Sequence, residues 1–194
     1  MPDAVCPRLS ACRALVGVLW WPQVLPQETD EQKWHMPKEM RCTACQAVAH
    51  RVATEVHERL RKRHNDELVG IVTLEALQDT CGDAHGFTSV YGILPTMNGV
   101  NVINGTGVDL PVGSKLPDDA MMTSEHSGKT GEKLSDVCKA LLLGADALEE
   151  DEFASMSLAA ESADAAVGMY RQELCFKEEG TPCWGIELEP SKES

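Results

Sequence analysis

Cysteine content constrains the fold of this chain more than any other feature of its sequence. The chain of 194 residues contains eight cysteines. Two of them, Cys6 and Cys12, lie in an N-terminal segment whose composition differs from the rest. The remaining six are spread along the chain, at Cys42, Cys45, Cys81, Cys138, Cys175 and Cys183. An even set of this kind predicts three disulfides in an oxidising compartment, and the alternative is a set of incidental buried cysteines.

The N-terminal segment, residues 1–27, is predicted to be a signal peptide. Arg8 and Arg13 precede a short apolar run at residues 14–21, and prolines follow it. A basic start, an apolar centre and helix breakers are typical of such peptides, although the usual small-residue cleavage pattern is missing. The run is too short to span a bilayer, and no later stretch predicts a membrane span. Residues 28–40 are predicted to be a flexible lead-in.

Composition limits both the partners and the core. Asp and Glu outnumber Lys and Arg by 31 to 17, which gives a formal net charge of −14. Binding to a nucleic-acid backbone requires a basic surface, so this balance argues against nucleic acid as a partner. Aromatic residues make up only 5% of the chain, so we expect a core built from leucine, valine, alanine and methionine.

The hydrophobic pattern predicts a mainly α domain over residues 41–184. Apolar and small residues recur at helical spacing in about four segments, at residues 42–60, 66–81, 131–148 and 150–174. Residues 185–194 are predicted to be a disordered acidic tail.

Residues 82–128 lack helical periodicity and are predicted to be an insertion between the helices. Apolar residues, mostly valines, occupy every second position on both sides of Asn104-Gly105. An Asn-Gly pair between two such alternating runs favours a β-hairpin, here near residues 99–112. Asn104-Gly105-Thr106 is also an N-glycosylation sequon, placed at the tip of this predicted hairpin.

Three histidines recur every seven residues beside the apolar stripe of the first predicted helix, at His50, His57 and His64. The spacing is compatible with a pH sensor or a metal stripe, but a solvated helix face is the simpler interpretation. No motif in the chain indicates a metal site or a cofactor.

An antiparallel helical arrangement would bring the two ends of the domain together, and this suggests how the cysteines pair. Cys42 and Cys45 share one helix face near the start of the domain, and two other cysteines lie near its end. The predicted pairs are Cys42–Cys183, Cys45–Cys175 and Cys81–Cys138. This nested order is one of fifteen possible connectivities. It resembles that of the saposin-like fold, a helical bundle stapled by disulfides.

The spacing of Cys42 and Cys45 also admits a redox function. In a thiol–disulfide oxidoreductase these two would be the candidate catalytic residues, and they would need an exposed thiol of lowered pKa. The helical pattern offers no βαβ unit of the thioredoxin kind, and a cysteine bonded to a distant partner cannot attack a substrate. Zinc is less favoured, because the chain has no second Cys-x-x-Cys pair.

Residues 35–52, HMPKEMRCTACQAVAHRV, resemble the opening of the family of the plasma-cell-induced endoplasmic reticulum protein, also called the marginal zone B and B1 cell-specific protein. The matching elements are His35-Met36-Pro37, Arg41-Cys42, Ala44-Cys45 and Ala47-Val48-Ala49. A weaker resemblance continues to Cys183, through residues 74–81, the predicted hairpin and the later cysteines. Canopy proteins share the six-cysteine saposin-like plan and are the nearest alternative family.

The resemblance implies a resident of the endoplasmic reticulum lumen that helps secretory chains to fold. Members of the family assist the folding, disulfide formation and secretion of immunoglobulin heavy and light chains, especially those of IgM, together with a lumenal chaperone of the Hsp90 class. A weak oxidoreductase activity attributed to the family would fall on Cys42 and Cys45 here. The chain ends in SKES instead of a Lys-Asp-Glu-Leu-type signal, so we expect retention through a partner, secretion, or a C-terminus that belongs to one isoform.

We therefore expect a saposin-like, disulfide-stapled helical bundle with a small β-hairpin insertion, acting as a folding helper rather than as an enzyme. Weak thiol–disulfide exchange is the first alternative, and lipid binding of the saposin type is the second. Low aromatic content, strong acidity and the long insertion argue against lipid binding. No cofactor is expected.

Overall fold

The computed structural model describes Trp34 and residues 36–64, 68–118, 124–143 and 148–189. The predicted signal peptide, with Cys6 and Cys12, lies outside the described residues. So do most of the predicted lead-in and the last part of the predicted tail.

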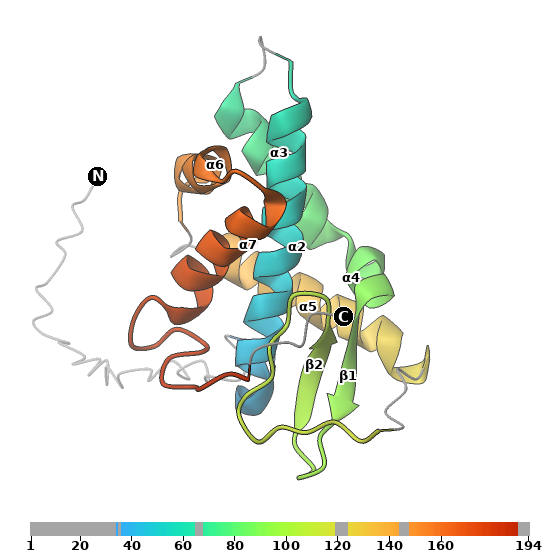
Figure 1. Cartoon of the computed structure of the whole chain (residues 1–194). Coiled ribbons are helices and arrows are strands. Elements are labelled where there is room, and N and C mark those ends of the chain that lie inside the picture. The colour runs from blue at the N-terminus through green and yellow to red at the C-terminus, as the bar shows by residue number, and fades with distance from the viewer. Residues whose placement is uncertain (1–33, 35, 65–67, 119–123, 144–147, 190–194) are drawn as a thin grey trace, which may run out of the picture.

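The predicted fold class is confirmed, because helices dominate and enclose one central helix together with a small two-stranded sheet (Figure 1). The central helix is α2 (Arg41–Lys62). The other helices are α3 (Val69–Gly82), α4 (Ala84–Val90), α5 (Ser124–Leu142), α6 (Glu150–Ala159) and α7 (Ala163–Arg171). A 3-10 turn, η1 (Lys38–Met40), precedes α2, and a π-helical turn, η2 (Gln172–Phe176), follows α7. Helices α3, α5, α6 and α7 pack directly on α2, and α4 packs on α5.

The first part of α2 is buried on all sides. Every residue of 41–49 is buried, and Ala44, Ala47 and Ala49 are small enough to let neighbouring elements approach the helix axis closely. Further along, burial narrows to one face that includes Val52 and Leu60. The sequence pattern predicts only this one-sided stripe, so it underestimates how deeply the start of the helix is enclosed.

The hairpin consists of two short strands that pack beside α2 and α5. β1 (Tyr91–Pro95) pairs antiparallel with β2 (Asn101–Gly105), and Ile93 lies opposite Ile103 (Figure 1). The predicted hairpin is therefore present, but its strands differ from those expected near residues 99–112.

The turn of this hairpin lies at Asn98-Gly99, and Asn104-Gly105 belongs to β2 instead. Gly99 has a φ of 80°, a conformation that glycine adopts without steric cost. The chain contains two Asn-Gly pairs, and the alternating valines around the second one favour the wrong pair. The first strand, YGILP, is too short and irregular in its polarity to be recognised as a strand.

The alternating segment after β2 does not extend the sheet. Pro111 forms an isolated antiparallel bridge with Leu188, and the Glu189 N–H donates to the Leu110 carbonyl at 2.9 Å. Residues 185–189 of the predicted disordered tail are therefore ordered. They follow Cys183, whose disulfide holds this part of the chain against α2.

Two further short elements occur where the sequence predicts none. α4 lies within the predicted insertion, and its start is capped by Asp83, whose Oδ1 accepts the Gly86 N–H at 2.8 Å. At the end of the predicted flexible lead-in, Met36 and Met40 are buried, and η1, which ends at Met40, leads directly into α2. Both elements are too short to show a helical period in the sequence.

The predicted fourth helix is divided into α6, α7 and η2. α6 ends at Ala159, and Ser162 begins the next helix by accepting the Ala165 N–H on its hydroxyl at 3.1 Å. Serine is a preferred N-cap residue, but the apolar period continues across the break and hides it. The predicted third helix corresponds to α5, which begins and ends earlier than expected.

Four of the seven aromatic residues that the structure describes are buried in the core, whereas the composition predicts an aliphatic core. Tyr91, Tyr170, Phe87 and Phe153 are the largest fully buried side chains. The rings of Phe153 and Tyr170 lie 5.4 Å apart, and the Tyr170 hydroxyl donates to the Phe153 carbonyl at 2.8 Å. Composition gives the number of aromatic residues correctly, but it cannot show that they fill the centre.

Candidate functional site

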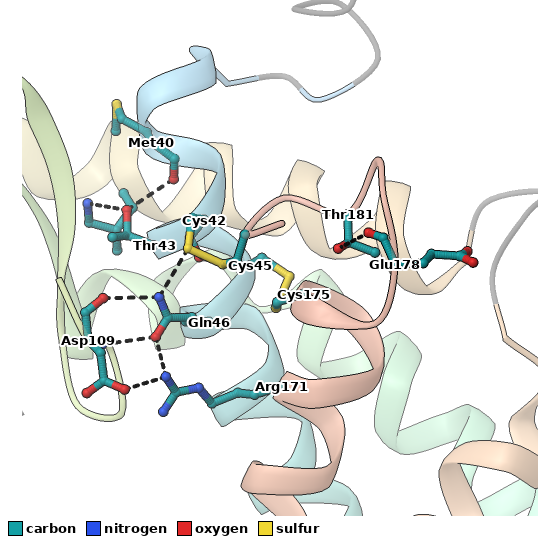
Figure 2. The surroundings of a disulfide bond; sticks show 12 residues. Met40, Cys42, Thr43, Cys45, Gln46, Asp109, Arg171, Cys175, Glu178 and Thr181 are labelled. Atoms are coloured by element: carbon teal, nitrogen blue, oxygen red, sulfur yellow. Dashed lines mark hydrogen bonds and ion pairs between the residues drawn. A yellow bond between two sulfur atoms is a disulfide. The ribbon is translucent and has the colours of Figure 1, made fainter. Parts of the chain in front are cut away.

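The Cys-x-x-Cys pair lies one turn apart at the buried start of α2, and both of its sulfurs are bonded to the C-terminal part of the domain (Figure 2). The described part of the chain contains three disulfides, Cys42–Cys183, Cys45–Cys175 and Cys81–Cys138. These are the three pairs that the antiparallel arrangement suggested. The first two join residues 141 and 130 positions apart, so they connect the beginning and the end of the fold.

Burial limits the chemistry that these sulfurs can perform. Cys42, Cys45 and Cys175 have no exposed surface, and Cys183 is 1% exposed. Thiol–disulfide exchange requires a thiolate to reach a sulfur atom of the bond. In this oxidised structure, Cys42 and Cys45 carry no free thiol and offer no accessible sulfur, so they form a covalent clamp between α2 and the end of the chain.

Gln46, one turn after Cys42, is fully buried beside these disulfides and pairs with the loop after β2 (Figure 2). Its amide nitrogen donates to the Asp109 carbonyl at 3.0 Å, and its amide oxygen accepts the Asp109 N–H at 3.0 Å. The same nitrogen lies 3.4 Å from Cys42 Sγ. A buried amide is tolerated because these bonds satisfy both of its ends.

Arg171 completes this polar cluster from α7. Its guanidinium donates to Asp109 Oδ2 and to Gln46 Oε1, each at 2.5 Å. The side chains of Arg171 and Asp109 are only 20% and 17% exposed, so the pair is partly shielded from water. Charge-assisted bonds of this kind are stronger than neutral ones, and here they connect α2, α7 and the loop next to the clamp.

Thr43 makes a second link between α2 and the hairpin. Its hydroxyl donates to the Met40 carbonyl at 3.1 Å and accepts the Ile103 N–H at 3.0 Å. That N–H lies on the edge of β2 that does not face β1. Sequence analysis misses Thr43 and Gln46, because both fall outside the apolar stripe of the helix; the only available signal is their position within or beside the Cys-x-x-Cys segment.

The three histidines do not share one solvated face. His57 is only 6% exposed, and its Nδ1 lies 3.1 Å from the Ser157 carbonyl. His50 is half-buried, with Nδ1 at 2.9 Å from the Tyr91 hydroxyl. His64 alone is exposed. The predicted solvated stripe is therefore wrong for His57, because α6 covers that part of α2.

The environment of His50 favours its neutral form. Burial lowers the pKa of His50, the neighbouring cations Arg171 and Arg51 lower it further, and Asp164 partly opposes them. Among the described residues, no group of three side chains is arranged to hold a metal ion.

Asn104, the candidate glycosylation site, is half-buried in β2 and lies opposite Gly92. Thr106, the third residue of the sequon, is exposed just beyond the strand. The sequon is thus at the end of a strand and not at the hairpin tip, and its glycosylation stays a prediction.

No protein-family model matches the chain, and no curated protein sequence matches it significantly.

Within the part of the chain that the structure describes, every helix is too short or too polar to cross a bilayer. Three disulfides are typical of proteins that fold in an oxidising environment, whether secreted or lumenal.

Proposed function

We propose that the protein is a folding helper of the endoplasmic reticulum lumen, which promotes the assembly and secretion of immunoglobulin chains of the IgM type and of other secretory chains. The resemblance of residues 35–52 to the plasma-cell-induced endoplasmic reticulum protein family motivates this function and its partner, a lumenal chaperone of the Hsp90 class. The mainly helical, disulfide-stapled fold supports it.

The observation that carries the proposal is the state of the Cys-x-x-Cys pair. Both cysteines are buried and bonded to partners more than a hundred residues away, so the motif fixes the fold and does not present a reactive dithiol. A protein stabilised in this way can act by binding its client through its surface, without forming a covalent intermediate with it.

The first experiment tests the helper function in cells. The chain is expressed in a secretory cell line that also produces IgM heavy and light chains, and assembled IgM in the medium is measured with and without it. We expect more secreted IgM and co-precipitation of the chain with the heavy chain inside the cell. An unchanged yield together with no co-precipitation would contradict the proposal.

A second experiment separates the helper from an oxidoreductase. The purified oxidised protein is incubated with a reduced, denatured secretory substrate, and the thiols of both proteins are labelled and mapped by mass spectrometry. If the protein oxidised its substrate, each new substrate disulfide would leave two new thiols on the protein. We expect no labelling of Cys42, Cys45, Cys175 or Cys183; labelling in step with substrate oxidation would favour the enzyme.

Lipid binding of the saposin type is tested with anionic vesicles at about pH 5, the acidic range in which carboxylates begin to lose charge. We expect no co-sedimentation, because the centre of the fold is filled by Tyr91, Tyr170, Phe87 and Phe153. Co-sedimentation with a change in helix content would favour the lipid binder.

A further inference from the structure

A groove lies on the side of the domain formed by α6, η2 and the loop after η2. It consists of two adjoining hollows, each of about 390 Å³, which share Leu148 and Glu173 as lining residues. One hollow follows the first turns of α6, and the other extends past the end of α5 to the loop at residues 178–182. The groove is separate from the polar cluster at Gln46 and contains none of its residues.

The floor of the groove is apolar. It is formed by Trp34, Leu141, Leu148, Met156 and Leu174. Leu174 is 9% exposed, and the other four are half-buried, so each presents part of an apolar side chain to the groove. Apolar side chains edged by polar ones in this way can accept the apolar side chains of a partner.

The rim of the groove is acidic. Its carboxylates are Asp151 and Glu152 on α6, Glu173 on η2, and Glu178 and Glu179 in the following loop. Lys177 is the only cation among the lining residues described for the two hollows, and it is paired with Glu173. The groove therefore carries a marked excess of negative charge above an apolar floor.

We propose that this groove binds a basic, apolar peptide segment of an unfolded secretory chain. Leucine-like side chains of the segment contact the floor, and its lysines or arginines face the carboxylates of the rim. As a client-binding site the groove rests on the proposed function, whereas its preference for such a peptide can be measured independently of any client.

Charge also disfavours the other possible occupants. A second copy of this chain carries a formal net charge of −14 and the same acidic rim, so it is repelled at close range. Residues 28–33, directly before Trp34, contain three acids and Lys33, and the acidic rim repels their net negative charge. An anionic vesicle is repelled for the same reason.

The binding test uses the purified oxidised protein and a fluorescein-labelled peptide of leucine and lysine at helical spacing, followed by fluorescence anisotropy. A peptide in which glutamate replaces every lysine is the comparison probe. We expect saturable binding of the leucine–lysine peptide that weakens with salt, and no binding of the leucine–glutamate peptide. Equal binding of both peptides would overturn the proposal.

The rim is tested with the double variant Glu178→Lys and Glu179→Lys. Both residues are exposed and follow η2, so the change leaves the helices intact. The matched control reverses two exposed acids outside the groove, Glu75→Lys on α3 and Glu132→Lys on α5, and gives the same net charge. We expect about a tenfold loss of peptide affinity in the rim variant and less than about a twofold loss in the control.

Equal losses in the two variants would show that the peptide senses only the overall charge, and the proposal would fail. The floor is tested with Met156→Gln, which should weaken binding at high salt as well as at low salt, because it removes apolar contact. Unchanged affinity in that variant would also contradict the groove. Circular dichroism and the count of free thiols check that each variant is folded.

Sedimentation of the free protein identifies a competing occupant. If the protein dimerises and the rim variant abolishes the dimer, a second copy occupies the groove and the proposal is wrong. If the groove binds the peptide but IgM secretion does not change, the proposed function fails while the groove stands. If secretion rises and the rim variant preserves it, the groove is not the client site.

Discussion

At the scale of single residues, Gln46 shows how a polar side chain becomes part of a core. It lies on α2 between the two disulfides and the loop after β2, and it satisfies the backbone of Asp109 and the guanidinium of Arg171 at the same time. Removing the amide would break its bonds to the Asp109 N–H and carbonyl, while Arg171 would keep its bond to Asp109 Oδ2. The cost of such a change comes from the unpaired groups more than from the lost bonds.

Replacing Gln46 with leucine should therefore lower the free energy of unfolding by about 3 kcal/mol, since several partly buried polar groups lose a hydrogen bond at the same time. Denaturant unfolding measures the effect. Gln78→Leu on the exposed side of α3 is the matched control and should change stability by less than about 0.5 kcal/mol. Similar values for both variants would mean that water replaces the amide without cost.

His50 gives a prediction for pH dependence. Its pKa is lowered by burial and by Arg171 and Arg51, with Asp164 opposing, and its neutral ring contacts the Tyr91 hydroxyl. The folded protein therefore binds fewer protons than the unfolded chain just below pH 6.5, the ordinary pKa of a histidine side chain. Stability that is present above this pH is lost as the pH falls through the folded-state pKa.

We expect His50→Gln to remove part of this pH dependence between about pH 7 and about pH 5, where an unperturbed histidine titrates. The measurement is the free energy of unfolding across this range for both proteins. His85→Gln, at an exposed position on α4, serves as the control for the loss of one imidazole. If both variants keep the wild-type dependence of the unfolding free energy on pH, His50 does not contribute to that dependence.

At the scale of elements, the hairpin shows how local signals compete. Two Asn-Gly pairs are available, and the turn forms at Asn98-Gly99 because β1 can then pair with β2 while Ile103 meets Thr43 on α2. The choice depends on contacts with α2, which lies some 60 residues away in sequence. A short-range turn rule cannot rank two equal signals, so the tertiary contact decides.

Gly99→Ala should destabilise the protein by about 1 kcal/mol, because a φ of 80° is strained for a residue with a Cβ atom although no neighbouring atom would clash. Gly168→Ala on the exposed face of α7 has the opposite expectation. A Cβ atom added at Gly168 meets no neighbouring atom, so the alanine should stabilise the helix by up to about 1 kcal/mol. Thermal unfolding of the two variants measures the difference. Equal shifts in melting temperature would mean that the hairpin turn does not lie at Gly99.

At the scale of the whole molecule, the two long disulfides act together. Each one alone closes a ring of well over a hundred residues. Once either bond is present, the other closes only a small ring, which consists of residues 42–45 and 175–183. The entropic benefit of a disulfide depends on the ring that it closes, so the effect of removing one bond depends on the presence of the other.

Removing only Cys42–Cys183, by alanine at both positions, should cost about 3 kcal/mol, and removing only Cys45–Cys175 should cost about the same. Removing both should cost about 8 kcal/mol, which exceeds the sum of the single losses. Denaturant unfolding of the three variants tests this coupling. Strictly additive losses would mean that the unfolded chain keeps its two ends close without the bonds.

The helical class, the presence of a hairpin and the cysteine pairs that a nested bundle can join are predictable from the sequence, because each depends on periodicity or on the order of residues along the chain. The sequence does not predict which Asn-Gly pair forms the turn, where the last helix breaks, that α6 covers His57 or that Gln46 bonds to Asp109. Those outcomes depend on contacts between segments far apart in sequence. The groove between α6 and η2 belongs to the same group, since its acidic rim and apolar floor come together only when the helices pack.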